Sequence, residues 1–171
     1  MEYGYIYITL YRSELLYHIE QVAFITGDVL KNPAEVKEQA NIQDIARSDR
    51  VDKTTLEMNR AWSELRAALS PFLEEATIYD QESTDALEVP DEYNVTFKVP
   101  EGFNAYNKEA VRTALHEYIV NSALASWFDI TKKDEAQLYR EKAAQELANA
   151  KRYLNMRTTP RRLKKSPPLI Y

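Results

Sequence analysis

The sequence predicts a mainly α-helical bundle of about four to five helices, with a small β-hairpin or strand insertion and an extended C-terminal arm. Three observations lead to this prediction. Long stretches between residues 106 and 156 repeat apolar residues at three- and four-residue steps, the period of an amphipathic helix. Residues 1–11 and 93–99 alternate, which is typical of strands. Residues 158–171 contain three prolines, which exclude a regular helix or sheet there.

Length and composition indicate one globular domain. The chain has 171 residues, of which 44% are hydrophobic and 29% charged, a balance typical of folded soluble proteins. There is no cysteine, which excludes disulfides, thiol catalysis and zinc–thiolate sites. No apolar run approaches the roughly 20 residues of a membrane helix, and the N-terminus lacks a signal-like segment. We therefore expect neither a membrane partner nor export.

The first predicted element is a strand with two different faces. Its alternating residues are Ile6, Ile8 and Leu10 on one side and Tyr3, Tyr5, Tyr7 and Tyr11 on the other. Two interpretations stay open. The strand is packed within its own fold, or it is an edge strand that docks on a neighbouring subunit. The second makes Tyr3, Tyr5 and Tyr7 candidate inter-subunit contacts.

Three helices are predicted before residue 72. The first begins near Ser13 and runs to about residue 30. A second, more polar helix begins at Pro33, a residue well suited to a first helical position. The third has a strong apolar stripe over residues 51–69 and ends at Pro71. Trp62 lies near the middle of this stripe, and we expect it in the core.

Residues 72–104 form the predicted β insertion. Residues 93–99 alternate as in a half-buried strand, and residues 76–79 are a candidate partner strand. Residues 81–88 are acidic and polar, which indicates a long loop. We expect Glu82 and Asp85 in this loop to be further inter-subunit contacts.

The two helices between residues 106 and 156 form a predicted antiparallel hairpin. Asn107 is a candidate N-cap of the first helix, and Thr131 is a candidate N-cap of the second, with Asp134 three residues later. The connection is short, so the two helices are expected to be antiparallel neighbours.

Charge divides the chain into a body, residues 1–156, and an arm, residues 157–171. The arm has five basic residues and no acidic one, so a total charge of −5 leaves −10 on the body. Its basic residues precede an apolar tip. We expect the arm to bind a partner through Arg157, Arg161, Arg162, Lys164, Lys165, Leu169, Ile170 and Tyr171.

No pattern of catalytic or ligand-binding residues is apparent. Three glycines cannot build a phosphate-binding loop. His18 and His116 are far apart in sequence, and neither has a partner at helical spacing that would make a metal pair. The sequence therefore predicts no enzyme, no catalytic residue, no cofactor and no metal.

The order of these features resembles that of tailed-phage head–tail connector (adaptor or neck-ring) proteins, encoded in phages and prophages of Bacteroides-type bacteria. The resemblance is carried by the segments Ile8–Leu15, Tyr93–Pro100, His116–Val120 and Ala123–Thr131, followed by the basic end. It extends over most of the chain.

The resemblance implies a structural virion protein in the head–tail neck, assembled in the host cytoplasm. Its partners would be the portal protein, neighbouring copies of itself in a ring, expected to be a dodecamer, and a tail or stopper protein. Genome DNA would pass through the channel without specific binding.

Three alternatives remain. One is another neck position, as a tail-completion or stopper protein. Another is a DNA-binding accessory protein, which the basic arm favours and the acidic body opposes. The last is a small helical enzyme, which no residue constellation supports.

Overall fold

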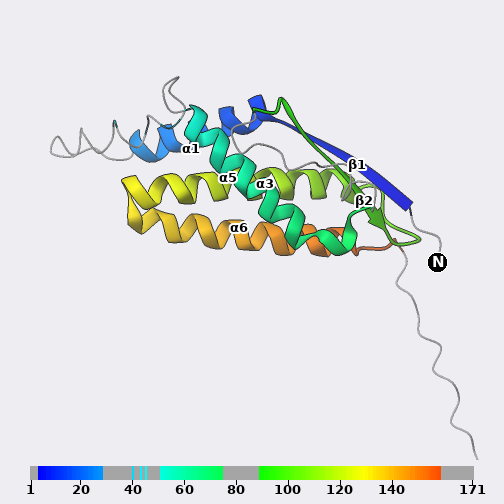
Figure 1. Ribbon diagram of the computed structural model, residues 1–171. Helices are drawn as coiled ribbons and strands as arrows, with labels where there is room; N and C mark the ends of the chain where they lie inside the picture. The colour runs from blue at the N-terminus through cyan, green and yellow to red at the C-terminus, as the bar shows by residue number, and fades with distance from the viewer. Residues whose placement is uncertain are drawn as a thin grey trace, which may run out of the picture.

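The structure is a computed structural model of the chain and describes residues 4–28, 40, 43, 45, 51–74 and 89–158. In these residues, four α-helices, one short 3-10 helix and a two-stranded antiparallel sheet are present (Figure 1). In chain order the elements are β1 (Gly4–Tyr11), α1 (Arg12–Asp28), α3 (Val51–Ala68), η3 (Ser70–Phe72), β2 (Glu92–Val99), α5 (Asn107–Thr131) and α6 (Lys133–Leu154). The predicted mainly α bundle with a small β element is confirmed.

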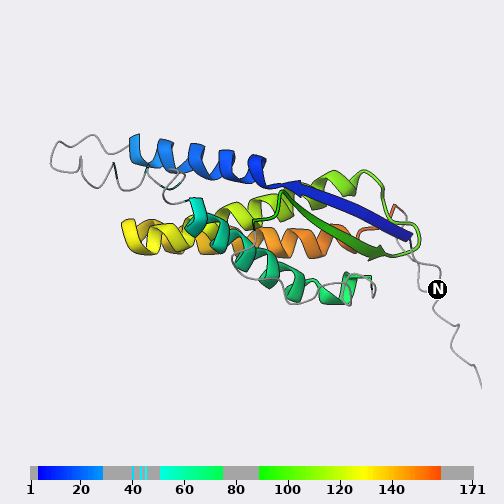
Figure 2. The same cartoon turned by 45° about the horizontal axis from the view of Figure 1, so that its top comes forward.

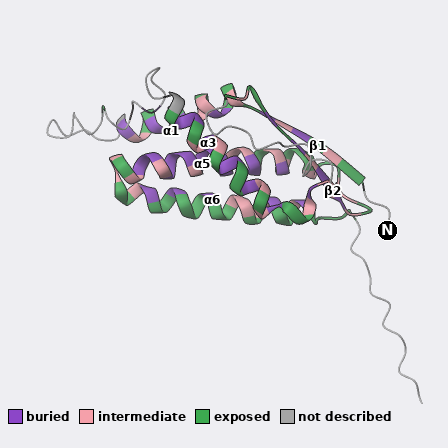
Figure 3. Cartoon of the chain, in the orientation of Figure 1, coloured by how far each residue is buried: buried purple, intermediate pink, exposed green. Residues whose placement is uncertain are grey.

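The central helix is α5, which contacts α1, α3, α6 and β1 (Figure 2). Residues 118–121 and 123–125 are all buried, so α5 is covered on more than one side. An ordinary surface helix buries only a single stripe. By contrast, α6 buries few positions and exposes many (Figure 3). The predicted α5–α6 hairpin is confirmed, with α5 as its inner helix.

The ends of this hairpin differ from the predicted caps. Asn107 is the first residue of α5, and its backbone N–H donates to the Asn104 carbonyl at 2.8 Å. Thr131 is the last residue of α5, and its hydroxyl donates to the Trp127 carbonyl at 3.1 Å. Both cap predictions were wrong: α5 begins one residue earlier than a cap at Asn107 requires, and at its other end it extends through Thr131. Lys132 alone separates α5 from α6.

The sheet covers one end of the bundle. β1 pairs with β2 in antiparallel register from Gly4↔Val99 to Tyr11↔Glu92. The inward rows contribute to the core with Ile8, Leu10, Tyr93, Val95, Phe97 and Val99. Residues 76–79, the predicted partner of β2, lie outside the described residues. Leu73, just before them, forms a single bridge with Phe97 of β2.

Trp62 lies in the core, and most of the predicted contact residues lie outside the described part of the chain. Trp62 is 7% exposed and packs against Tyr93 with ring centroids 5.5 Å apart, so its place in the core is confirmed. Beyond α6, Arg157 is exposed and bridges Phe103. Outside the described residues lie the start of the predicted helix at Pro33, the contacts Tyr3, Glu82 and Asp85, and the arm residues Arg161, Arg162, Lys164, Lys165, Leu169, Ile170 and Tyr171.

Candidate functional site

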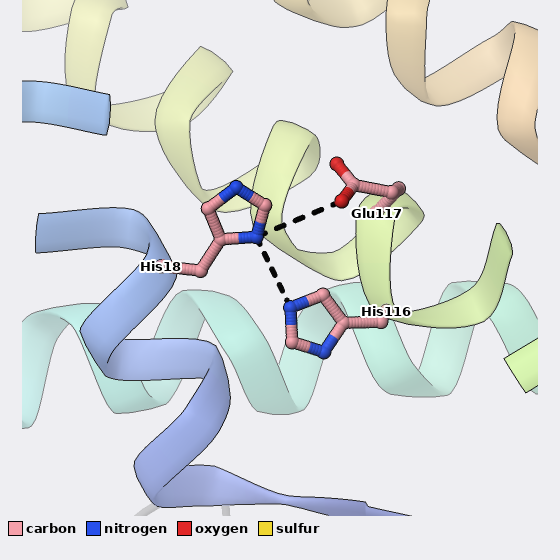
Figure 4. A group of neighbouring side chains, drawn as sticks. All are labelled: His18, His116 and Glu117. Carbon is pink, nitrogen blue, oxygen red and sulfur yellow. Dashed lines mark hydrogen bonds and ion pairs between the residues drawn. The ribbon is translucent and has the colours of Figure 1, made fainter. Parts of the chain in front are cut away.

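The described residues contain one group of three side chains whose donor atoms converge as metal ligands do: His18, His116 and Glu117. His18 lies on α1, and the other two lie on α5 (Figure 4). His18 Nδ1 is 3.1 Å from His116 Nε2 and 3.6 Å from Glu117 Oε1. The two imidazole rings are stacked, with centroids 5.3 Å apart. We call these three residues the His–His–Glu cluster.

Packing of α1 on α5 positions the cluster. Leu15 and Ile19 of α1 are fully buried, as are Leu115 and Ile119 of α5. A residue next to such a buried position lies at the edge of the helix–helix contact, because successive residues turn by about 100°. His18 precedes Ile19, and His116 follows Leu115, so the apolar contact brings the two imidazoles together at its rim.

The protonation of His116 follows from this position. Its pKa is lowered from 6.5 to about 4, chiefly because burial disfavours the charged ring. His18 and Arg112 lower the pKa further, whereas Glu14 raises it. His116 is therefore neutral at pH 7. One of the two facing nitrogens must then carry the hydrogen and the other accept it.

The cluster opens onto a cleft of about 430 Å³ between α1, α5 and α6. His18 and Glu117 lie on its wall, and their side chains are 35% and 34% exposed. The α6 side contributes Lys142 and Glu146. The Lys142 ammonium lies 4.4 Å from the centre of the Tyr139 ring. Water and small ions therefore have access to the cluster from one side.

A second cleft of about 440 Å³ lies between α3, α5 and α6. Four of its five charged residues form two ion pairs. Arg140 pairs with Asp129, and Arg60 contacts Glu64 at 3.2 Å. With Glu57, the lining has two basic and three acidic side chains, and no convergent group of ligands lies among its described residues.

The predicted contact residues Tyr5 and Tyr7 lie on the outer face of β1, where they are 57% and 54% exposed. α1 adds exposed apolar residues that were not predicted as contacts: Tyr17, Phe24 and Ile25, between 54% and 65% exposed. These three residues lie off the apolar stripe of α1. Apolar residues outside the stripe are visible in the sequence and could have identified this exposed surface. The His–His–Glu cluster was also missed, because its two helices are brought together only by the fold.

Comparisons of the chain with models of known families, with curated proteins and with solved structures find no match. Among the helices that the structure describes, none is long and apolar enough to cross a membrane.

Proposed function

We propose that this protein is a non-enzymatic structural subunit of a tailed-phage neck, a head–tail connector that assembles into a ring beneath the portal. The observation that carries the proposal is the exposed aromatic row on β1, formed by Tyr5, Tyr7 and Tyr11. A helical body that carries a strand with an exposed outer face at one end is well suited to side-by-side assembly. The order of elements along the chain supports the same assignment.

The aromatic row has the properties of an interface. Tyr5 and Tyr7 are more than half exposed on one strand face. Tyrosine combines a large apolar ring with a polar hydroxyl and is enriched at protein–protein interfaces. Of the two edges of β1, one pairs with β2, and no described residue pairs with the other. An unpaired edge beside an aromatic face favours addition of a segment from a second copy.

A closed ring needs two different surfaces on each subunit, because its contacts are head-to-tail. The exposed face of α1, with Tyr17, Phe24 and Ile25, offers an apolar surface on a different element from the aromatic row. We assign these two surfaces to the two sides of the subunit contact. Glu82 and Asp85 stay predicted contacts.

The basic arm supplies the proposed attachment to the portal. Arg157, its first residue, is exposed directly after α6. The five basic residues of residues 157–171 contrast with the acidic body. In the proposal, basic contacts and burial of the apolar tip together offset the entropy lost when the arm is ordered on the portal.

Mass photometry and electron microscopy of the purified full chain test ring formation. We expect a discrete closed oligomer that Tyr5→Thr/Tyr7→Thr converts to monomer. Tyr106→Thr is the matched control, because Tyr106 is 91% exposed but lies outside the aromatic row. A chain that stays monomeric at every concentration, or a ring unaffected by the double substitution, contradicts the proposal.

Two further measurements separate the alternatives. Deleting residues 160–171 should abolish pull-down of the portal protein, while the body stays folded. A gel-shift titration with salt should show no tight binding to duplex DNA. Steeply salt-dependent binding would instead favour the DNA-binding alternative.

A further inference from the structure

We propose that the His–His–Glu cluster binds one divalent transition-metal ion, with zinc as the best match, and that this ion joins α1 to α5. The inference is independent of the neck-ring proposal, since it concerns a different part of the molecule. It rests on the positions of three donor atoms, on their chemistry and on the open cleft beside them.

The spacing of the donor atoms fits a small metal ion. Bonds of 2.0–2.1 Å in a tetrahedral site place neighbouring ligand atoms about 3.4 Å apart. His18 Nδ1 lies 3.1 Å from His116 Nε2 and 3.6 Å from Glu117 Oε1, on either side of that value. All three donor atoms lie within 4.8 Å of one another. The three donor atoms would close to about 3.4 Å from one another when the ion binds.

The donor types select the metal. Two imidazoles and one carboxylate are the ligands of many zinc sites with an open fourth position. Ca²⁺ and Mg²⁺ favour sites built from oxygen atoms alone. Each ring can present a lone pair to the ion once its hydrogen is on the opposite nitrogen, which is Nε2 in His18 and Nδ1 in His116.

The surroundings allow a doubly charged ion. Glu117 supplies a negative ligand, and Glu146 lies on the wall of the same cleft. Lys142 also lines this wall, with its ammonium over Tyr139. Arg112 is paired with Glu14 at 2.8 Å, so these two charges balance. A water molecule from the cleft can take the fourth coordination position.

The ion would connect segments that are distant in the chain. His18 and His116 are 98 residues apart. Between α1 and α5 the structure otherwise has apolar packing by residues such as Leu15 and Ile19, together with the Arg112–Glu14 ion pair at the surface. A metal bound only by the folded chain stabilises that chain by mass action. The bound ion would therefore fix the β1–α1 layer, with its aromatic row, against the central helix.

Isothermal titration of the full chain with Zn²⁺ tests the site. The protein carries no polyhistidine tag and is first treated with a chelator. We expect one zinc ion per chain, and a thermal midpoint raised by about 5–10 °C at a zinc concentration 100 times the Kd. We expect zinc binding to weaken by about 100-fold in each of three variants, His18→Gln, His116→Gln and Glu117→Gln. Loss of a direct ligand should cost at least as much affinity as loss of an outer-shell partner, which costs about 10- to 100-fold.

Glu20→Gln is the matched control, because Glu20 is exposed on α1 outside the cluster; its affinity for zinc should equal that of the parent chain. If His116→Gln does not fold, His18→Gln decides, since His18 lies at the surface end of the cluster. The proposal is overturned by absence of binding up to about 1 mM zinc. Stoichiometric binding that survives His18→Gln and Glu117→Gln overturns it equally.

Discussion

The α5–α6 hairpin and the β1–α1 layer use similar apolar residues in opposite ways. Phe128 on α5 is fully buried and packs against Tyr139 of α6 with ring centroids 5.1 Å apart. Phe24 on α1 is 54% exposed. The hairpin buries most of its large apolar residues within the chain, with Ile130 and Leu138 as exposed exceptions, whereas the outer layer leaves a larger share of its apolar side chains to solvent. The difference separates residues that hold the fold from residues available to a partner.

The largest difference in the free energy of unfolding is expected when a phenylalanine is replaced by alanine in each of the two regions. Phe128→Ala should lower the free energy of unfolding by about 3–5 kcal/mol, because it leaves a cavity in a packed core. Phe24→Ala should change it by less than about 0.5 kcal/mol, as at most surface sites. Urea denaturation of both variants measures the difference. Equal losses would show that Phe24 is buried in the protein in solution, and would remove the distinction between the two regions.

The hairpin was predictable from sequence because its signals are local. The apolar stripes of α5 and α6 recur within each helix, and the alternation of residues 93–99 identifies β2 without reference to any other segment. The caps were less predictable. Asn107 and Thr131 have the chemistry of N-caps, but Tyr106 takes the cap position of α5, and α5 extends through Thr131, which leaves Lys132 between the helices.

The outer layer was predicted in part. The two faces of β1 were evident, yet its pairing with β2 spans more than 80 residues of chain, and no local pattern contains such a contact. The His–His–Glu cluster was unpredictable for the same reason, because His18 and His116 are distant in the chain and meet only when α1 packs on α5. Spacing along one helix, the usual signal for a metal pair, is absent here.

Titration of His116 gives a pH test of the contact between the two regions. Its pKa in the folded chain, about 4, lies below the 6.5 of an unperturbed histidine. The unfolded chain therefore takes up the proton first as the pH falls, so the stability that depends on neutral His116 is complete above pH 6.5 and is lost between pH 6.5 and 4. Partial exposure limits the loss to about 1–2 kcal/mol.

The pH test needs a variant and a chelator. Carboxylates also titrate over this range, so the measured quantity is the difference between the parent chain and His116→Gln in the presence of EDTA. His18, Glu14, Arg112 and Glu117 surround the ring and stay unchanged in both proteins. Parallel pH profiles for the two chains would mean that His116 is solvated and that α1 packs less closely on α5.

A smaller effect is expected from the ion pair that links the two regions at the surface. Arg112 on α5 donates to Glu14 of α1 at 2.8 Å and to the Thr9 carbonyl of β1 at 3.4 Å. Arg112→Ala should cost about 0.5–1 kcal/mol, less at high salt because both charges are partly exposed. Arg60→Ala, which breaks an exposed pair within α3, is the control. A loss above about 2 kcal/mol would indicate a buried rather than a surface link.

The smallest effect on folding should come from the aromatic row. In Tyr5→Thr/Tyr7→Thr, both positions are exposed and threonine retains a high strand propensity, so the free energy of unfolding should change by less than about 0.5 kcal/mol. Urea denaturation at a concentration where the chain is monomeric isolates this quantity from assembly. A loss comparable to that of Phe128→Ala would instead place the tyrosines in the core of the single chain. They would then be unavailable to a neighbouring subunit, and the contrast between the two regions would fail at the residues on which the neck-ring proposal depends.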